Sequence, residues 1–100
     1  MNENYKIIEK LIDKIKKQKN ADVSNSYTAK LFSEGKVKIA NKLGEESTET
    51  ISAFLCQQKK DICEEASDLI YHLLVLLEHA EVSFSDIVKV LEKRMTEKQE

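Results

Sequence analysis

The stretch that decides the fold is Asp61–Leu77, which reads DICEEASDLIYHLLVLL. Its second half, Leu69–Leu77, is apolar on almost every side when it is wound into a helix, and such a helix is buried on more than one face. A chain of 100 residues has little material with which to surround it. The pattern therefore predicts a helical domain whose central helix is completed by a second copy of the chain.

The rest of the sequence also favours helices. It contains no proline and only 2 glycines, which is typical of long helices joined by short polar connections. The predicted class is all-α with four to five helices, forming one domain over residues 1–100 with its ordered core at about residues 4–95. Apolar spacing and capping residues place the helices at residues 4–19, from a cap at 24–26 to Gly35, at 37–57, at 60–80, and from Ser83 or Ser85 to about residue 95.

Apolar residues at helical spacing identify the side chains that should face the core. In the first helix these are Ile8, Leu11, Ile12 and Ile15. The two remaining sets are Ile39, Leu43, Ile51, Phe54 and Leu55 in the helix over 37–57, and Ile87, Val88, Leu91 and Met95 in the last helix.

Composition argues against several classes of protein. A net charge of −2 is too acidic for a general nucleic-acid binder. The longest apolar run is far shorter than the ~20 residues that a membrane-spanning helix needs. The polar start Asn2–Asn4 shows no secretory signal, so we expect a cytoplasmic protein in which Cys56 and Cys63 are reduced, structural thiols.

Two acidic steps suggest the chemistry: Glu46-x-x-Glu49 and Glu65-x-x-Asp68. Residues three apart share a helix face, so four carboxylates converge if the two helices pack side by side. Two unit charges about 4 Å apart repel by on the order of 4 kcal/mol at an effective dielectric near 20. A cation relieves that repulsion, and for oxygen ligands the natural ion is Mg²⁺, followed by Mn²⁺.

The surroundings of these acids support a site. The helical stripes that should face each other are Asp61, Glu65, Asp68 and His72 on one helix and Lys42, Glu46, Glu49 and Ala53 on the other. Asp68 adjoins the apolar block, where a buried carboxylate is costly unless it has a partner. For His72, a core histidine hydrogen-bonded to Asp68 or to a backbone carbonyl is favoured over a catalytic role.

Local rules are also broken around the first acidic step. Gly44 lies inside a predicted helix at a cost of about 1 kcal/mol relative to alanine, and Glu45 and Glu49 oppose each other at (i, i+4). Such violations are expected at functional sites, and Gly44 would allow close backbone approach there. A di-iron site is disfavoured, because the Glu-x-x-His step it needs is missing.

Three blocks carry a resemblance to a known family. They are SYTAKL at 26–31, GKVKIANKLGEESTE at 35–49 and EEASDLIYHLLVLL at 64–77. Over about residues 1–95 the chain resembles the phosphoribosyl-ATP pyrophosphohydrolases, a family within the MazG-like all-α nucleotide pyrophosphohydrolases. The acidic motif alone indicates the superfamily, whereas the first and third blocks indicate this family. Lys36 departs from the pattern, since the family often has proline there.

The resemblance implies hydrolysis of phosphoribosyl-ATP to phosphoribosyl-AMP and pyrophosphate, the second step of histidine biosynthesis. It implies that Mg²⁺, or Mn²⁺ as a substitute, is held by Glu46, Glu49, Glu65 and Asp68. Glu45, Glu46 and Glu49 are the catalytic candidates, with the attacking water held by an acid such as Glu45 or Glu49. The candidates to contact substrate phosphates are Lys30, Lys38 and Lys42.

The resemblance also implies partners. We expect a homodimer, a stand-alone form of the enzyme, and a functional neighbour in the phosphoribosyl-AMP cyclohydrolase, to which the family is often fused. Neither nucleic acid nor a membrane is expected to bind.

Two other functions remain open at this point. A house-cleaning pyrophosphohydrolase acting on dUTP, dCTP or damaged nucleotides would use the same acids, but it gives no reason for the block at 26–31. A non-catalytic helical dimer would leave Gly44 and the acids beside the apolar block unexplained.

Overall fold

The structure is a computed structural model that describes residues 3–56 and 58–97. Within these residues it is all-α, as predicted, with five helices and no strand. The helices are α1 (Glu3–Gln18), α2 (Tyr27–Glu34), α3 (Lys36–Cys56), α4 (Lys59–His79) and α5 (Phe84–Thr96). None of the helices in these two ranges has the length and apolar character needed to cross a bilayer.

The helix boundaries follow the predicted capping residues. Ser26 caps α2, because its side chain accepts a hydrogen bond from the Ala29 N–H at 3.1 Å. Gly35 ends α2 with a φ of +92°, a backbone conformation that favours glycine. Ser83 caps α5. The predicted end of α3 at residue 57 lies outside the described residues.

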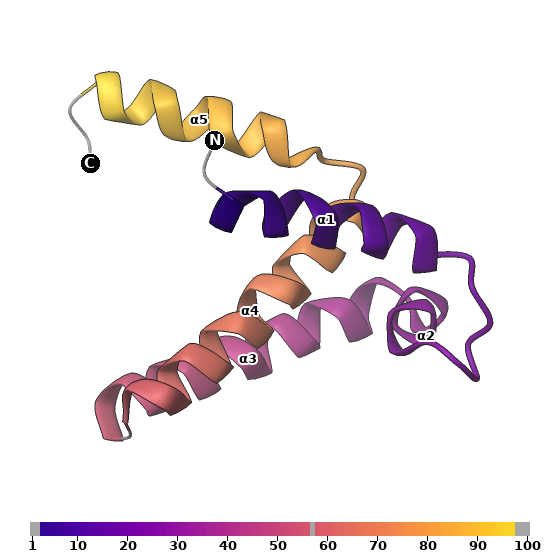
Figure 1. The fold of residues 1–100 in the computed structure, drawn as a ribbon. Coiled ribbons are helices and arrows are strands. Elements are labelled where there is room, and N and C mark those ends of the chain that lie inside the picture. The colour runs from indigo at the N-terminus through magenta and orange to yellow at the C-terminus, as the bar shows by residue number, and fades with distance from the viewer. Residues whose placement is uncertain (1–2, 57, 98–100) are drawn as a thin grey trace.

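The centre of the molecule is the antiparallel pair formed by α3 and α4, which make the most extensive contact between elements (Figure 1). Helix α2 packs on α3, and α1 packs across α4. Helix α5 returns beside α1, and residues of these two helices line a shared apolar groove (Figure 1). The pairing of α3 with α4 is the arrangement on which the predicted carboxylate site depends.

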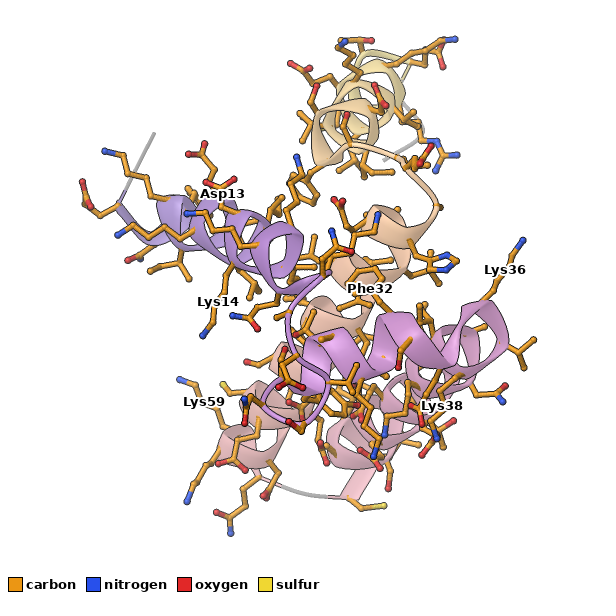
Figure 2. All side chains as sticks on the ribbon, turned by 90° about the vertical axis from the view of Figure 1, so that its right-hand side faces the viewer. Asp13, Lys14, Phe32, Lys36, Lys38 and Lys59 are labelled. Carbon is orange, nitrogen blue, oxygen red and sulfur yellow. The ribbon has the colours of Figure 1, made fainter. Side chains whose placement is uncertain are left out.

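The core joins the first four helices. Its buried members are Ile15 from α1, Leu31 from α2, Ile39 from α3, and Leu74 and Val75 from α4. Phe32 packs against them, whereas Lys14, Lys36 and Lys59 point outward (Figure 2). No residue of α5 in the described range is buried.

Several predicted core residues are exposed in this single chain. On α3, Ile51, Phe54 and Leu55 are exposed, and Phe54 is 72% accessible. Ile39 is buried as predicted, and Glu46 and Ala53 join it in a stripe of residues seven apart, which leaves Ile51, Phe54 and Leu55 outside the buried stripe of α3. On α5 the predicted inward side chains Val88, Leu91 and Met95 are exposed as well.

Candidate active site

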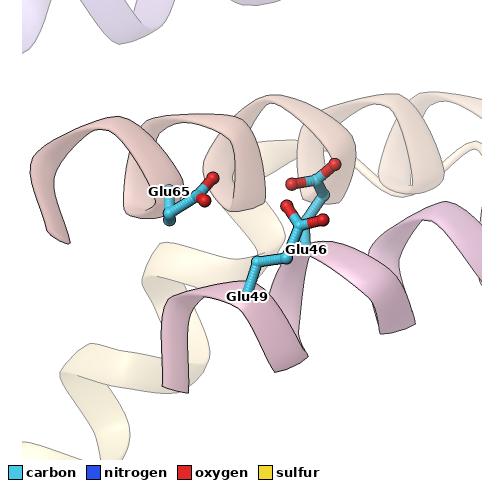
Figure 3. Close-up of side chains that lie close together, drawn as sticks. All are labelled: Glu46, Glu49 and Glu65. Carbon is cyan, nitrogen blue, oxygen red and sulfur yellow. The ribbon is translucent and has the colours of Figure 1, made fainter. Parts of the chain in front are cut away.

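Three of the predicted acids form a cluster between α3 and α4, which we call the acidic seam: Glu46, Glu49 and Glu65. One carboxylate oxygen of each lies within 4.8 Å of those of the other two. Figure 3 shows Glu46 and Glu49 reaching up from α3 and Glu65 reaching toward them from α4. The convergence predicted from the two acidic steps is therefore present for these three residues.

Asp68 differs from its prediction. It was expected to be buried beside the apolar block, but it is exposed and its carboxylate does not belong to the cluster of three. The physical reason lies in how α4 is rotated against α3, because the same step of three residues keeps Glu46 and Glu49 together on α3. Asp68 is still close enough for its charge to raise the pKa of both Glu46 and Glu65.

Glu46 is the most constrained member of the seam. It is only 7% exposed, and within the described residues its Oε2 atom is buried without a hydrogen-bond partner. Burial raises the pKa of its carboxyl group, and Glu49 and then Asp68 raise it further, against the opposing charge of Lys42. A buried oxygen without a partner costs about 1–3 kcal/mol, so folding alone does not account for this side chain.

Glu65 shows the same electrostatic pattern from the opposite helix. It is half-buried, and burial followed by the charges of Glu49 and Asp68 raises the pKa of its carboxyl group. The charges of Glu49 and Asp68 thus make both Glu46 and Glu65 harder to ionise. An oxygen-ligand set of this kind fits a hard divalent cation, which would satisfy the unpartnered Glu46 oxygen and offset the repulsion.

The predicted lysines occupy three different environments. Lys42 lies at the seam, with its Nζ atom 3.8 Å from a Glu45 oxygen and 3.9 Å from a Glu46 oxygen. Lys30 is exposed and lines a shallow hollow together with Ser26 and Tyr27 of the first block. Lys38 is exposed on α3. The structure therefore brings Glu45 and Lys42 to the acidic seam.

A second polar contact, which sequence reasoning missed, joins α2 to α4. We call it the aromatic seam: Tyr27, Thr28, Tyr71 and His72. The Tyr27 hydroxyl lies 3.0 Å from His72 Nε2, and the Thr28 and Tyr71 hydroxyls hydrogen-bond to each other. The signal was present in the sequence, because these residues belong to the first and third blocks that carried the family resemblance.

His72 has the structural role that was predicted for it. It is buried, and its Nδ1 atom lies 2.7 Å from the backbone carbonyl oxygen of Asp68. A carbonyl can only accept, so Nδ1 carries the proton and Nε2 accepts from the Tyr27 hydroxyl. Burial raises the pKa of Tyr27, whereas the charge of Lys42 lowers it.

The predicted role of Gly44, a close approach of its backbone to a ligand, stays a prediction. A Cβ atom added at this position would meet nothing within 4 Å among the described residues, so the space beside it is open. Nothing in the structure explains why this helical position is glycine. The two cysteines, Cys56 and Cys63, are free and exposed.

The sequence matches known proteins over most of its length. The sequence profile described as phosphoribosyl-ATP pyrophosphohydrolase matches residues 8–95. A "Histidine biosynthesis bifunctional protein HisIE" from Buchnera aphidicola is 46% identical over 91% of this chain and 44% of the relative. A protein of the same name from Campylobacter jejuni is 49% identical over 87% of this chain and 41% of the relative.

A shorter relative is matched over most of its own length. The "Phosphoribosyl-ATP pyrophosphatase" of Rhizorhabdus wittichii is 42% identical over 87% of this chain and 82% of its own length. By contrast, the chain spans about two fifths of the length of the bifunctional relatives. With the profile covering residues 8–95 and the three blocks lying within that range, the chain belongs to the phosphoribosyl-ATP pyrophosphohydrolase family.

Proposed function

We propose that this chain hydrolyses phosphoribosyl-ATP to phosphoribosyl-AMP and pyrophosphate, the second step of histidine biosynthesis. The observation that carries the proposal is the acidic seam, in which a buried glutamate oxygen without a partner lies in a cluster of three carboxylates. Membership of the family supports the choice of substrate. The proposed location of the reaction is the cytoplasm.

Mg²⁺ is the proposed cofactor, with Mn²⁺ as a substitute. Glu46, Glu49 and Glu65 would hold the ion. Asp68 would be the fourth acid, which is supported by the effect of its charge in raising the pKa of Glu46 and of Glu65. Mg²⁺ prefers six oxygen ligands and usually keeps several waters, so this set leaves room for substrate phosphate. When bound, the ion would neutralise the charge that develops on the phosphate oxygens as the bond breaks.

The remaining groups would act on the attacking water and on the substrate. Glu45 or Glu49 would accept a proton from the water as its oxygen forms a new bond to phosphorus, and the anhydride bond breaks to release pyrophosphate. Lys42 would meet phosphate oxygens at the seam, where its ammonium group already faces Glu45 and Glu46. Lys30 and Lys38 are proposed to contact more distant parts of the substrate.

The proposed enzyme is a homodimer. Support comes from exposed apolar side chains on the two helices that bear the acids: Ile51, Phe54 and Leu55 on α3, and Ile70 and Leu73 on α4. A second copy of the chain would cover them. Sedimentation velocity should give a dimer for the wild type and a monomer for Phe54→Glu. A wild-type chain that sediments as a monomer would contradict this part.

The cyclohydrolase that consumes phosphoribosyl-AMP is the proposed functional neighbour. The length of the bifunctional relatives supports this, since they carry a further segment beyond the part that this chain matches.

The deciding experiment is pyrophosphate release with Mg²⁺ from phosphoribosyl-ATP, measured beside dUTP, dCTP and ATP. The proposal expects fast release from phosphoribosyl-ATP only, and loss of that release in Glu46→Gln. Release from a free nucleotide only would move the chain to the house-cleaning function with the same acids. The absence of release from every substrate would contradict an enzymatic role.

A further inference from the structure

Thr50 makes a contact that no other described hydroxyl in α3 is seen to make. Its Oγ1 atom lies 2.7 Å from the backbone carbonyl oxygen of Glu46 in the same helix and 3.1 Å from that of Glu65 in α4. A hydroxyl has one proton to donate, so the two carbonyls share it in a three-centre hydrogen bond. The side chain thereby ties the backbones of two acidic-seam residues together.

Other hydroxyls near the site show that this bridge is not an ordinary consequence of helical geometry. Ser47, Thr48 and Ser67 each donate to the carbonyl four residues earlier in their own helix. That local pattern is common for serine and threonine in helices. Thr50 has the same local bond and adds a bond across to α4, at the level where the carboxylates converge.

The consequence concerns the distance between the two halves of the seam. Glu46 and Glu49 project from α3 and Glu65 from α4, so the separation of these helices fixes how closely the three carboxylates approach. Mg²⁺ demands near-ideal octahedral geometry with oxygens at about 2.0–2.1 Å, so a small widening of the gap weakens binding. The carboxylates of the acidic seam repel one another, and a hydrogen bond between the two helices opposes that repulsion.

We propose that Thr50 is a positioning residue that holds α3 and α4 at the spacing the metal site needs. The inference rests on the proposed function, since it assumes that the acidic seam binds a divalent cation. Thr50 touches neither the ion nor the substrate in this role. Its effect passes through the backbones of Glu46 and Glu65, as partners outside the ligand set commonly act on metal affinity.

The test is the affinity for Mn²⁺, measured from the electron paramagnetic resonance signal of free Mn²⁺ during titration of the whole chain. Thr50→Val keeps the shape and removes the hydroxyl, and Thr50→Ser keeps the hydroxyl. Thr48→Val is the matched control, because Thr48 is exposed and donates within its own helix. We expect Thr50→Val to bind Mn²⁺ about 10- to 100-fold more weakly, while Thr50→Ser and Thr48→Val stay close to the wild type.

Circular dichroism at the titration temperature checks that each variant is folded. Should Thr50→Val fail to fold, Thr50→Ala takes its place as the variant without the hydroxyl, against the same Thr50→Ser. Wild-type Mn²⁺ affinity in the folded variant that lacks the hydroxyl would overturn the inference, and so would an equal loss in Thr50→Ser. A wild-type chain that binds no Mn²⁺ would instead overturn the metal site of the proposed function, and the inference with it.

Discussion

Helix α4 takes part in two polar contacts, which differ in whether their polar atoms have hydrogen-bond partners. In the aromatic seam, the Tyr27 hydroxyl, both His72 nitrogens and the Thr28 and Tyr71 hydroxyls all have partners. In the acidic seam, carboxylates face one another and the Glu46 Oε2 atom is buried without one. The first contact stabilises the fold through satisfied hydrogen bonds. The second leaves a buried oxygen without a partner among like charges, which fits the proposed metal site.

The largest difference between the seams should appear in catalysis. Glu46→Gln removes a proposed metal ligand, and because partners outside the ligand set already cost 10- to 100-fold, we expect turnover to fall by at least about a hundredfold. The melting temperature in EDTA should not fall, because the substitution removes a buried charge that its neighbours repel. Pyrophosphate release and thermal melting check both points. Glu9→Gln, on exposed α1 surface, is the control that should keep full activity.

The second difference concerns metal-linked stability. Mg²⁺ or Mn²⁺ should raise the melting temperature of the wild type, and an ion at about 100 times its Kd adds about 2.7 kcal/mol to the free energy of unfolding. The Glu46→Gln, Asp68→Asn double variant should lose most of that shift. Differential scanning fluorimetry with and without EDTA measures it. Equal shifts in the two proteins would mean that the ion binds elsewhere.

Substitutions in the aromatic seam should lower the free energy of unfolding even in the metal-free chain. His72→Leu removes the acceptor of the Tyr27 hydroxyl and the donor to the Asp68 carbonyl, and leaving such groups unpaired costs about 1–3 kcal/mol. Tyr27→Phe should cost less, because the Tyr27 side chain is half exposed and His72 keeps its bond to Asp68. Urea unfolding of the metal-free chain gives both values. A His72→Leu chain as stable as the wild type would show that this seam does not stabilise the fold.

The smallest effect is the pH dependence of the acidic seam. The pKa of Glu46 is raised in the folded chain above its ordinary value of 4.5, so the folded state holds the proton more tightly than the unfolded state. Its contribution is therefore fully present below the unfolded pKa and is lost as pH rises through the folded pKa. In EDTA, the unfolding free energy of the wild type minus that of Glu46→Gln should fall as pH rises above about 4.5. A difference that grows with pH would contradict a raised Glu46 pKa.

Much of this architecture follows from local sequence rules. Ser26, Gly35 and Ser83 mark helix boundaries because capping depends on a few neighbouring residues. The two acidic steps indicate the acidic seam because a spacing of three on a helix fixes a shared face. His72 was expected to bond to Asp68 or a backbone carbonyl for the same local reason, and it bonds to the Asp68 carbonyl.

What could not be predicted depends on how helices pack. The pairing of Tyr27 with His72 joins residues 45 positions apart, and no local rule connects them. The exposure of Asp68 and Phe54 depends on how α3 and α4 are rotated against each other, which apolar spacing alone leaves open. The exposed apolar residues follow the sequence pattern of a buried helix face, but within the described residues of this single chain nothing covers them.

The most direct test of the central claim is to locate Mn²⁺ by anomalous X-ray diffraction from crystals of the chain grown with the ion. The account predicts an anomalous peak between α3 and α4, coordinated by Glu46, Glu49 and Glu65. The same crystals of Glu46→Gln should lose the peak or show it weakened. A strong peak away from the acidic seam, or none in a wild-type crystal saturated with Mn²⁺, would contradict the account.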